Sequence, residues 1–314
     1  MRDRPATTRF GPTEWGLSTV LALTWGSSFL LIALAIEHLD PAVVPLGRSV
    51  IGAAALWFFP GAREPIPRAH WPRIALLGLV WMALPFWLFP LAEQTVASSV
   101  AGMMNGGLPV VIAAVTAVWV RRMPSAQRIG AIALGFIGIV VVALPAVRSD
   151  AAEKQIADAL GITWLALALL GYAVGSNLAR PLQAIYSPAQ LLMRVQLAAA
   201  LWMLPFGAPA LTRSQFAWSS TIALVVLGVM GTGVAFVAFG TLLERTGITR
   251  AMIPTYFTPI VGLVLGVAFN AESIATLSIV GMLIVIASAW LTSKPDDRDV
   301  MLSDGEHLER RDIS

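Results

Sequence analysis

Residues 101–111 read AGMMNGGLPVV, and residues 251–261, at an offset of 150, read AMIPTYFTPIV. Each stretch begins with alanine, has proline eight residues later and valine two residues after that, and contains no charged residue. Each lies in a longer apolar run of about the ~20 residues that a helix needs to cross a bilayer core. The pair therefore predicts two related transmembrane helices.

Eight further apolar runs extend this pattern along the chain. Eight of the ten runs contain no Asp, Glu, Lys or Arg, and the other two hold one arginine each, Arg48 and Arg194. Because backbone groups in lipid must be satisfied within their own segment, we expect these runs to be helices rather than open strands. The ten predicted spans are Trp15–Ile36, Ala42–Phe59, Ile74–Ala92, Thr95–Val118, Ile129–Val147, Leu160–Ala179, Ala189–Phe206, Ile222–Leu243, Ala251–Phe269 and Ile274–Leu291.

The composition favours a membrane bundle and excludes several classes of protein. The 314 residues are 57% hydrophobic and 12% charged, whereas soluble domains are about 25% charged. The chain has no cysteine, which excludes disulfides, thiolate metal sites and a cysteine nucleophile. No P-loop or HExxH motif is present, so neither ATP hydrolysis nor zinc proteolysis is expected. We expect no cofactor, no metal and no nucleic-acid partner.

The basic residues are distributed unevenly between alternate loops. With ten spans both termini lie on one side, and that side receives sixteen of the 21 Lys and Arg residues. The other side receives Arg148, Lys154 and Arg213. The positive-inside rule then places both termini in the cytoplasm. The first run is too long for a cleaved signal peptide, whose apolar core is about 7–15 residues. The predicted location is a bacterial inner membrane.

The two halves of the chain repeat each other in order. Runs one to five match runs six to ten at offsets that drift only from 146 to 151, and runs two and seven each carry their arginine and then Ala-Ala-Leu-Trp. Five spans is an odd number, so the second repeat enters the membrane inverted. Inverted repeats are typical of carriers that alternate access to a site at the midplane. The predicted units are a cytoplasmic segment 1–14, repeats 15–147 and 160–292, an external linker 148–159 and a cytoplasmic polar tail 293–314.

Several short motifs, in this order, resemble one known family. The first half has Trp25-Gly26-Ser27-Ser28-Phe29, Pro41 with Arg48, Leu108-Pro109, and Gly130 with Gly138; the second has Pro188 with Arg194, Pro259, Glu272 and Gly281. Over residues 15–292 the chain resembles the EamA-like transporters of the drug/metabolite transporter superfamily. The resemblance implies a ten-helix carrier with a central cavity, often an exporter of metabolites or amino acids. One departure is Arg121-Arg122, which stands where members usually have a glutamate.

Ionisable residues at membrane depth are functional candidates by default. Arg48 and Arg194 each lie about seven residues, or roughly 10 Å, inside a span. Each arginine either snorkels or hydrogen-bonds carbonyls at a helix joint, or else it contacts an anionic group of a substrate. The sequence leaves both alternatives open.

Uncharged polar and aromatic groups also reach the middle of the spans. They either join helices or line a cavity. Asn105, followed by two glycines and Pro109, and Tyr256, three residues before Pro259, are expected to face a common cavity between two bent helices. The full set of predicted substrate-binding residues is Trp25, Ser28, Arg48, Asn105, Tyr172, Asn177, Arg194 and Tyr256. No catalytic residue is predicted.

No carboxylate lies in the middle of a span. Glu14 is at the start of the first run, and Glu93 and Glu272 fall in predicted external loops. Uniport or metabolite exchange is therefore favoured over proton-for-cation exchange, and proton coupling through water or a peripheral acid stays open.

These features predict an ATP-independent transporter of small organic metabolites such as amino acids, working by alternating access in the lipid bilayer as a monomer or homodimer. A membrane-embedded transferase or lipid-handling enzyme is the alternative.

Overall fold

The computed structural model describes residues 11–121, 123–146, 148, 152–246 and 248–292. Every regular element in this part of the chain is helical. The predicted segment 1–14 lies largely outside the described residues, and the predicted tail 293–314 entirely so.

Each predicted apolar run contains at least one helix. The first half comprises α1 (Pro12–Ile36), α2 (Val43–Trp57), α3 (Trp71–Leu77), α4 (Leu84–Ala92), α5 (Ser98–Asn105), α6 (Leu108–Val120) and α7 (Ala126–Ala143). The second comprises α8 (Ala152–Gln183), α9 (Pro188–Ala210), α10 (Trp218–Gly228), α11 (Ala235–Thr246), α12 (Ile248–Ala251), α13 (Ile253–Phe269) and α14 (Thr276–Thr292). Short 3₁₀ turns occupy Arg68–His70 and Leu211–Arg213. Because α8 begins at Ala152, it takes in most of the predicted linker 148–159.

Six of the described helical stretches are long and apolar enough to cross a membrane alone, and α5 with α6 would form a seventh across a 42° bend. The helices α2, α13 and α14 are apolar but shorter, with 15, 17 and 17 residues. Many large apolar side chains point outward, among them Leu201 at 69% and Val264 at 57% exposure. On a soluble surface such patches would drive association, whereas here lipid covers them.

The third and eighth predicted spans share an irregularity. One π-helical turn, Gly78–Ala83, joins α3 to α4, and another, Val229–Val234, joins α10 to α11. Insertions of this kind are rare within helices and often mark functional positions. The two turns lie at an offset of 151, close to the offset of the sequence repeat.

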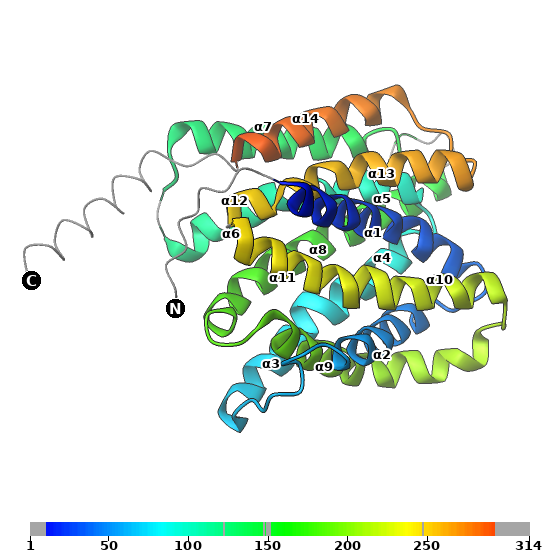
Figure 1. The fold of residues 1–314 in the computed structure, drawn as a ribbon. Helices are drawn as coiled ribbons and strands as arrows, with labels where there is room; N and C mark the ends of the chain where they lie inside the picture. The colour runs from blue at the N-terminus through cyan, green and yellow to red at the C-terminus, as the bar shows by residue number, and fades with distance from the viewer. Residues whose placement is uncertain (1–10, 122, 147, 149–151, 247, 293–314) are drawn as a thin grey trace, which may run out of the picture.

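The helix pairs that pack together follow the same repeat. Figure 1 shows α7 beside α14 at one edge of the bundle and α2 beside α9 at the opposite edge, each pairing corresponding helices of the two halves. The packing of α1 on α11 has its counterpart in α8 on α4, and that of α1 on α13 has its counterpart in α8 on α6. Exchanging the halves therefore maps these packing partners onto one another.

The fourth and ninth predicted spans differ at their prolines. The fourth breaks between Asn105 and Leu108, but α13 continues unbroken through Pro259. Only the fourth span is therefore interrupted at its proline. Gly106 and Gly107 weaken the helix before Pro109, whereas Tyr256 and Phe257 occupy the corresponding positions before Pro259.

Candidate functional site

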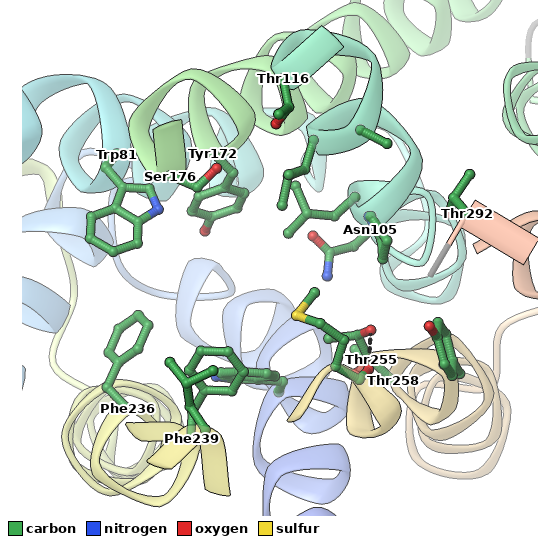
Figure 2. A pocket seen from close by; sticks show the side chains of 18 of the residues that line it. Trp81, Asn105, Thr116, Tyr172, Ser176, Phe236, Phe239, Thr255, Thr258 and Thr292 are labelled. Carbon is green, nitrogen blue, oxygen red and sulfur yellow. Dashed lines mark hydrogen bonds between the residues drawn. The ribbon is translucent and has the colours of Figure 1, made fainter. Parts of the chain in front are cut away.

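A cavity of about 1180 Å³ lies between the two halves of the bundle. Figure 2 shows side chains from α5, α8, α11 and α13 around this shared space, with the Asn105 amide and the Tyr172 hydroxyl directed into it. The first half also contributes α1, α2, α4 and α6 to the lining, and the second also contributes α14. The cavity is therefore a joint product of both halves.

Six of the eight predicted substrate-binding residues line this cavity. They are Trp25, Ser28, Arg48, Asn105, Tyr172 and Tyr256. Asn105 and Tyr256 face the same space, as the repeat suggested. Tyr256 Oη also donates a hydrogen bond of 3.4 Å to the Ala289 carbonyl of α14.

Asn177 does not line the cavity. Its side chain is buried, where Nδ2 donates to the Ala173 carbonyl at 2.9 Å and Oδ1 accepts from Thr116 Oγ1 at 3.1 Å. The bond from Thr116 joins α6 to α8, which is the helix-joining role that the sequence also allowed.

Arg194 lies elsewhere in the bundle and holds a loop. One terminal nitrogen donates to the Ala62 and Gln190 carbonyls at 2.5 and 2.9 Å, and the other donates to the Glu64 carbonyl. Its side chain is 7% exposed. The arginine therefore fixes the segment after α2 against α9, which matches the carbonyl-binding alternative.

Arg48 has a different environment, although it is equally buried. Its Nε donates to Thr232 Oγ1 in the π-helical turn at 2.9 Å, and its guanidinium stacks on Phe86 with Cζ 3.8 Å from the ring centre. Among the described residues no carboxylate forms an ion pair with it. Its terminal nitrogens make no hydrogen bond within the described chain and are not sealed from solvent. They are therefore available to a ligand in the cavity.

The lining combines positive charge with aromatic surface. Arg48, Arg128 and Arg180 line it, and no Asp or Glu is present among the described lining residues. The lining also has nine aromatic residues, namely Trp25, Phe29, Trp81, Phe86, Phe89, Tyr172, Phe236, Phe239 and Tyr256. A cleft of one sign attracts ligands of the opposite charge. The site therefore suits an organic anion with an apolar body.

Several of these residues were missed from the sequence. Aromatic residues in spans more often face lipid or neighbouring helices, so Trp81 and Phe86 are not among the site residues that the sequence predicts. Arg128 and Arg180 were counted only as orienting loop charges. Phe236 follows the second π-helical turn, and the corresponding turn of the first half contains Trp81. Comparison of the two halves at these turns is therefore the sequence signal that could identify both residues.

The cavity opens at only one end. We call the end where Pro12 and Thr292 lie the terminal end and the opposite end the far end (Figure 1). Met123, Arg180 and Gln183, which are exposed at the terminal end, belong to the lining. Among the described residues of the far-end loops (37–42, 93–97, 211–217 and 270–275), none lines it.

Close packing of three helices forms one wall of the cavity. A Cβ on Gly26 of α1 would lie 2.5 Å from Val261 Cβ of α13, and one on Gly102 of α5 would lie 3.4 Å from Gly262 Cα. Phe29 and Phe89 belong to the lining, with ring centres 5.5 Å apart.

Hydrogen bonds and one salt bridge fix the loops at the far end. Glu272 accepts hydrogen bonds from the backbone amides of Ser98 and Ser99 at 2.8 and 2.9 Å, so it caps α5. Asp40 binds Arg213 at 2.9 Å and so joins the α1–α2 loop to the α9–α10 loop.

Comparison with known proteins agrees with this architecture. The model of the EamA-like transporter family matches residues 15–144 and again 159–294. An "Uncharacterized transporter" of Archaeoglobus fulgidus is 22% identical, over 87% of this chain and 96% of its own. A "Probable terminal-alkyne amino-acid exporter" of Streptantibioticus cattleyicolor is 26% identical, over 89% and 93%. A chloroplastic WAT1-related protein of Arabidopsis thaliana is 20% identical, over 91% and 70%.

A solved crystal structure shares the fold with a TM-score of 0.60 at 16% identity, and the match covers 88% of this chain and 95% of that one. The family and the first two of these relatives are named as transporters or exporters, not enzymes. This chain, a multi-pass membrane protein, belongs to the EamA-like transporter family.

Proposed function

We propose that this protein is an ATP-independent exporter of small carboxylate-bearing metabolites, amino acids included, in a bacterial inner membrane. It has ten spans in two inverted five-helix repeats, with both termini in the cytoplasm. The interchangeable packing partners and the paired π-helical turns support the repeat. The bias of basic residues toward the terminal end supports the orientation.

The observation that carries this proposal is the cavity itself. It is large, lies between the two halves, opens at the terminal end and is closed at the far end. In the proposed orientation this is a cytoplasm-open state, from which an exporter loads its substrate. Rocking of the two halves would then open the far end and release the substrate outside.

Arg48 anchors the substrate carboxylate in this scheme. It lies among apolar side chains, with no carboxylate in the described lining to pair with it, and charge-assisted hydrogen bonds are strong in such a place. The ammonium of an amino acid would meet neutral acceptors, Ser28 and Asn105, and aromatic faces such as Trp25. The amino-acid exporter among the relatives agrees with this substrate class.

Flux into sealed proteoliposomes without ATP tests the proposal. The probes are phenylacetate, its neutral amide phenylacetamide, the cation phenethylamine, and phenylalanine. We expect flux of phenylacetate and phenylalanine well above protein-free liposomes, and little flux of phenethylamine. Arg48→Gln is expected to abolish this preference, and Arg68→Gln, at an exposed arginine outside the cavity, to keep it. Equal flux of the cation and the anion would contradict the anchoring role.

A further inference from the structure

The sequence placed Glu93 in an external loop, but the structure buries its carboxylate. The residue follows the end of α4 directly, and both of its carboxylate oxygens are shielded from solvent without a hydrogen bond to any described residue. An ionised carboxylate in such a place loses its hydration without compensation and takes up a proton instead.

Glu93 lies between the cavity and the far-end surface. Phe89, four residues earlier, lines the cavity, and the Glu93 amide donates to the Phe89 carbonyl at 2.9 Å, so the helical turn continues to Glu93. Residues four apart share a helix face. The Glu93 side chain is therefore one turn, or about 6 Å, farther toward the far end than the cavity lining.

Charged groups surround this position from several elements. Arg48 on α2 and Glu272 between α13 and α14 both act on Glu93 electrostatically. The loop packs on the start of α8, where Thr95 Oγ1 donates to the Ala157 carbonyl at 3.1 Å and where Glu153, Lys154 and Asp158 lie. Helix α1 also packs on α4, and the only charged residue within α1 is Glu14, which lies at the opposite end.

The two glutamates at this end have opposite protonation preferences. Burial, and then the negative charge of Glu272, raise the pKa of Glu93 well above its usual value, against a smaller opposing effect of Arg48. Burial also tends to raise the pKa of Glu272, but hydrogen bonds from Ser99, Ser98 and Asn270 outweigh it and lower that pKa. Neighbouring carboxyl groups with separated pKa values are a recurrent arrangement for proton transfer.

We propose that Glu93 couples proton binding to closure of the far end. It holds a proton while the far end is closed; when that end opens to water the O–H bond breaks and the proton leaves to the outside solution, and when the end closes Glu93 takes a proton back from that same solution. This inference rests on the proposed function, since it assigns a proton to the same alternating cycle. It develops the alternative of a peripheral acid, which the lack of a carboxylate in mid-span left open.

The coupling has a definite sign. Because the closed far end binds the proton more tightly, protons stabilise that state, and by reciprocity closing the far end favours proton binding. A rise in external pH therefore drives the far end open, by up to about tenfold in the ratio of open to closed forms per pH unit.

The first test detects the proton directly. Infrared spectra of the full-length protein in lipid nanodiscs at neutral pH are expected to show the carbonyl stretch of a protonated carboxylic acid. Glu93→Gln should lose this band, while Glu37→Gln, at an exposed glutamate of the same end, should keep it. Glu93→Met serves the same purpose if the Gln variant does not accumulate. An unchanged band in both Glu93 variants would overturn the assignment.

The second test follows the far end. The chain has no cysteine, so a single cysteine at Ile32, a buried cavity-lining residue, reports on opening. In intact cells its labelling by a membrane-impermeant maleimide is compared with that of Gln94→Cys, which is exposed at the same end and corrects for thiol ionisation. We expect the ratio to rise with external pH, and Glu93→Gln to remove that rise.

The outcomes separate the two proposals. If probes are transported but Glu93→Gln leaves both the infrared band and the pH response of labelling unchanged, proton coupling at Glu93 is wrong and the transport proposal stands. If no probe is transported but the band and the labelling response both depend on Glu93, the proton site is supported and the proposed substrate class is wrong.

Discussion

Replacing the two membrane arginines one at a time is expected to give opposite results. The sequence treats Arg48 and Arg194 as equivalent, each the single charge of its span. In the structure the terminal nitrogens of Arg194 bind three backbone carbonyls, whereas those of Arg48 are open to the cavity. Arg48→Gln should therefore impair ligand binding, and Arg194→Gln should impair folding.

The magnitudes follow from these contacts. A hydrogen bond to a charged group contributes about 1.5–3 kcal/mol, so loss of the Arg48 contact should weaken phenylacetate binding by roughly tenfold to a hundredfold. Removing a buried charge without an acidic partner relieves its desolvation, so Arg48→Gln should not lower stability. Arg194→Gln removes charge-assisted hydrogen bonds to three carbonyls, of which that of Glu64 keeps a bond from Gln190 Nε2, and should lower stability by on the order of 3 kcal/mol.

Thermal unfolding of the purified variants, with and without phenylacetate, measures both effects at once. A ligand raises the unfolding temperature according to its concentration relative to Kd. Arg48→Gln should unfold at or above the wild-type temperature and gain little from phenylacetate. Arg194→Gln should unfold several degrees lower and gain as much from phenylacetate as the wild type.

The reverse pattern of stability and binding would contradict these roles of Arg48 and Arg194. If Arg48→Gln unfolds early but binds phenylacetate normally, Arg48 has a structural role and the cavity assignment loses its anchor. If Arg194→Gln keeps its stability but loses binding, the substrate site lies on the other side of α9.

Three further changes test other parts of the structure. Glu14→Gln should retain above about half of wild-type flux, because Glu14 is outside the cavity lining and its partner Arg245 is 50% exposed, so the pair is weak; abolished flux in a folded variant would place Glu14 in the cycle. Glu272→Gln should remove the acid-sensitive stability that Glu272 contributes. Because the pKa of Glu272 is lowered in the folded state, its ionised form stabilises the fold at pH values above 4.5, the ordinary pKa, and this stabilisation is lost as pH falls through the folded-state pKa. An unfolding temperature that varies with acid pH as in the wild type would contradict this. Gly26→Ala should cost about 1–3 kcal/mol of stability because its Cβ would lie 2.5 Å from Val261 Cβ. Gly16→Ala, where a Cβ would have nothing within 4 Å, should cost nothing. Equal unfolding temperatures for the two variants would be evidence against close packing of α1 on α13.

The sequence predicted the positions of the helices well, because an uninterrupted apolar run has few alternatives in a bilayer. It also predicted that Asn105 and Tyr256 share a space, since the repeat relates the segments that carry them. The unbroken course of α13 through Pro259 was not predictable from proline alone, because the two preceding residues decide whether the helix breaks.

The site was predicted less completely than the helices. Arg48 and Arg194 differ because carbonyls of the loop after Trp57 accept hydrogen bonds from Arg194 only. The spacing of apolar residues in the helices does not predict the course of that loop. The burial of Glu93 depends on how the α4–α5 loop packs against α8. Distances along the chain do not specify either arrangement.

Alternating access requires that Asn105 be reached from each side of the membrane in turn. In sealed vesicles of known orientation a cysteine at this position, in a chain with no other cysteine, is exposed to an impermeant maleimide from one side at a time. The account predicts labelling from the cytoplasmic side and, separately, from the external side, with phenylacetate slowing both. Labelling from one side only under every condition, or from neither, would contradict alternating access at this cavity.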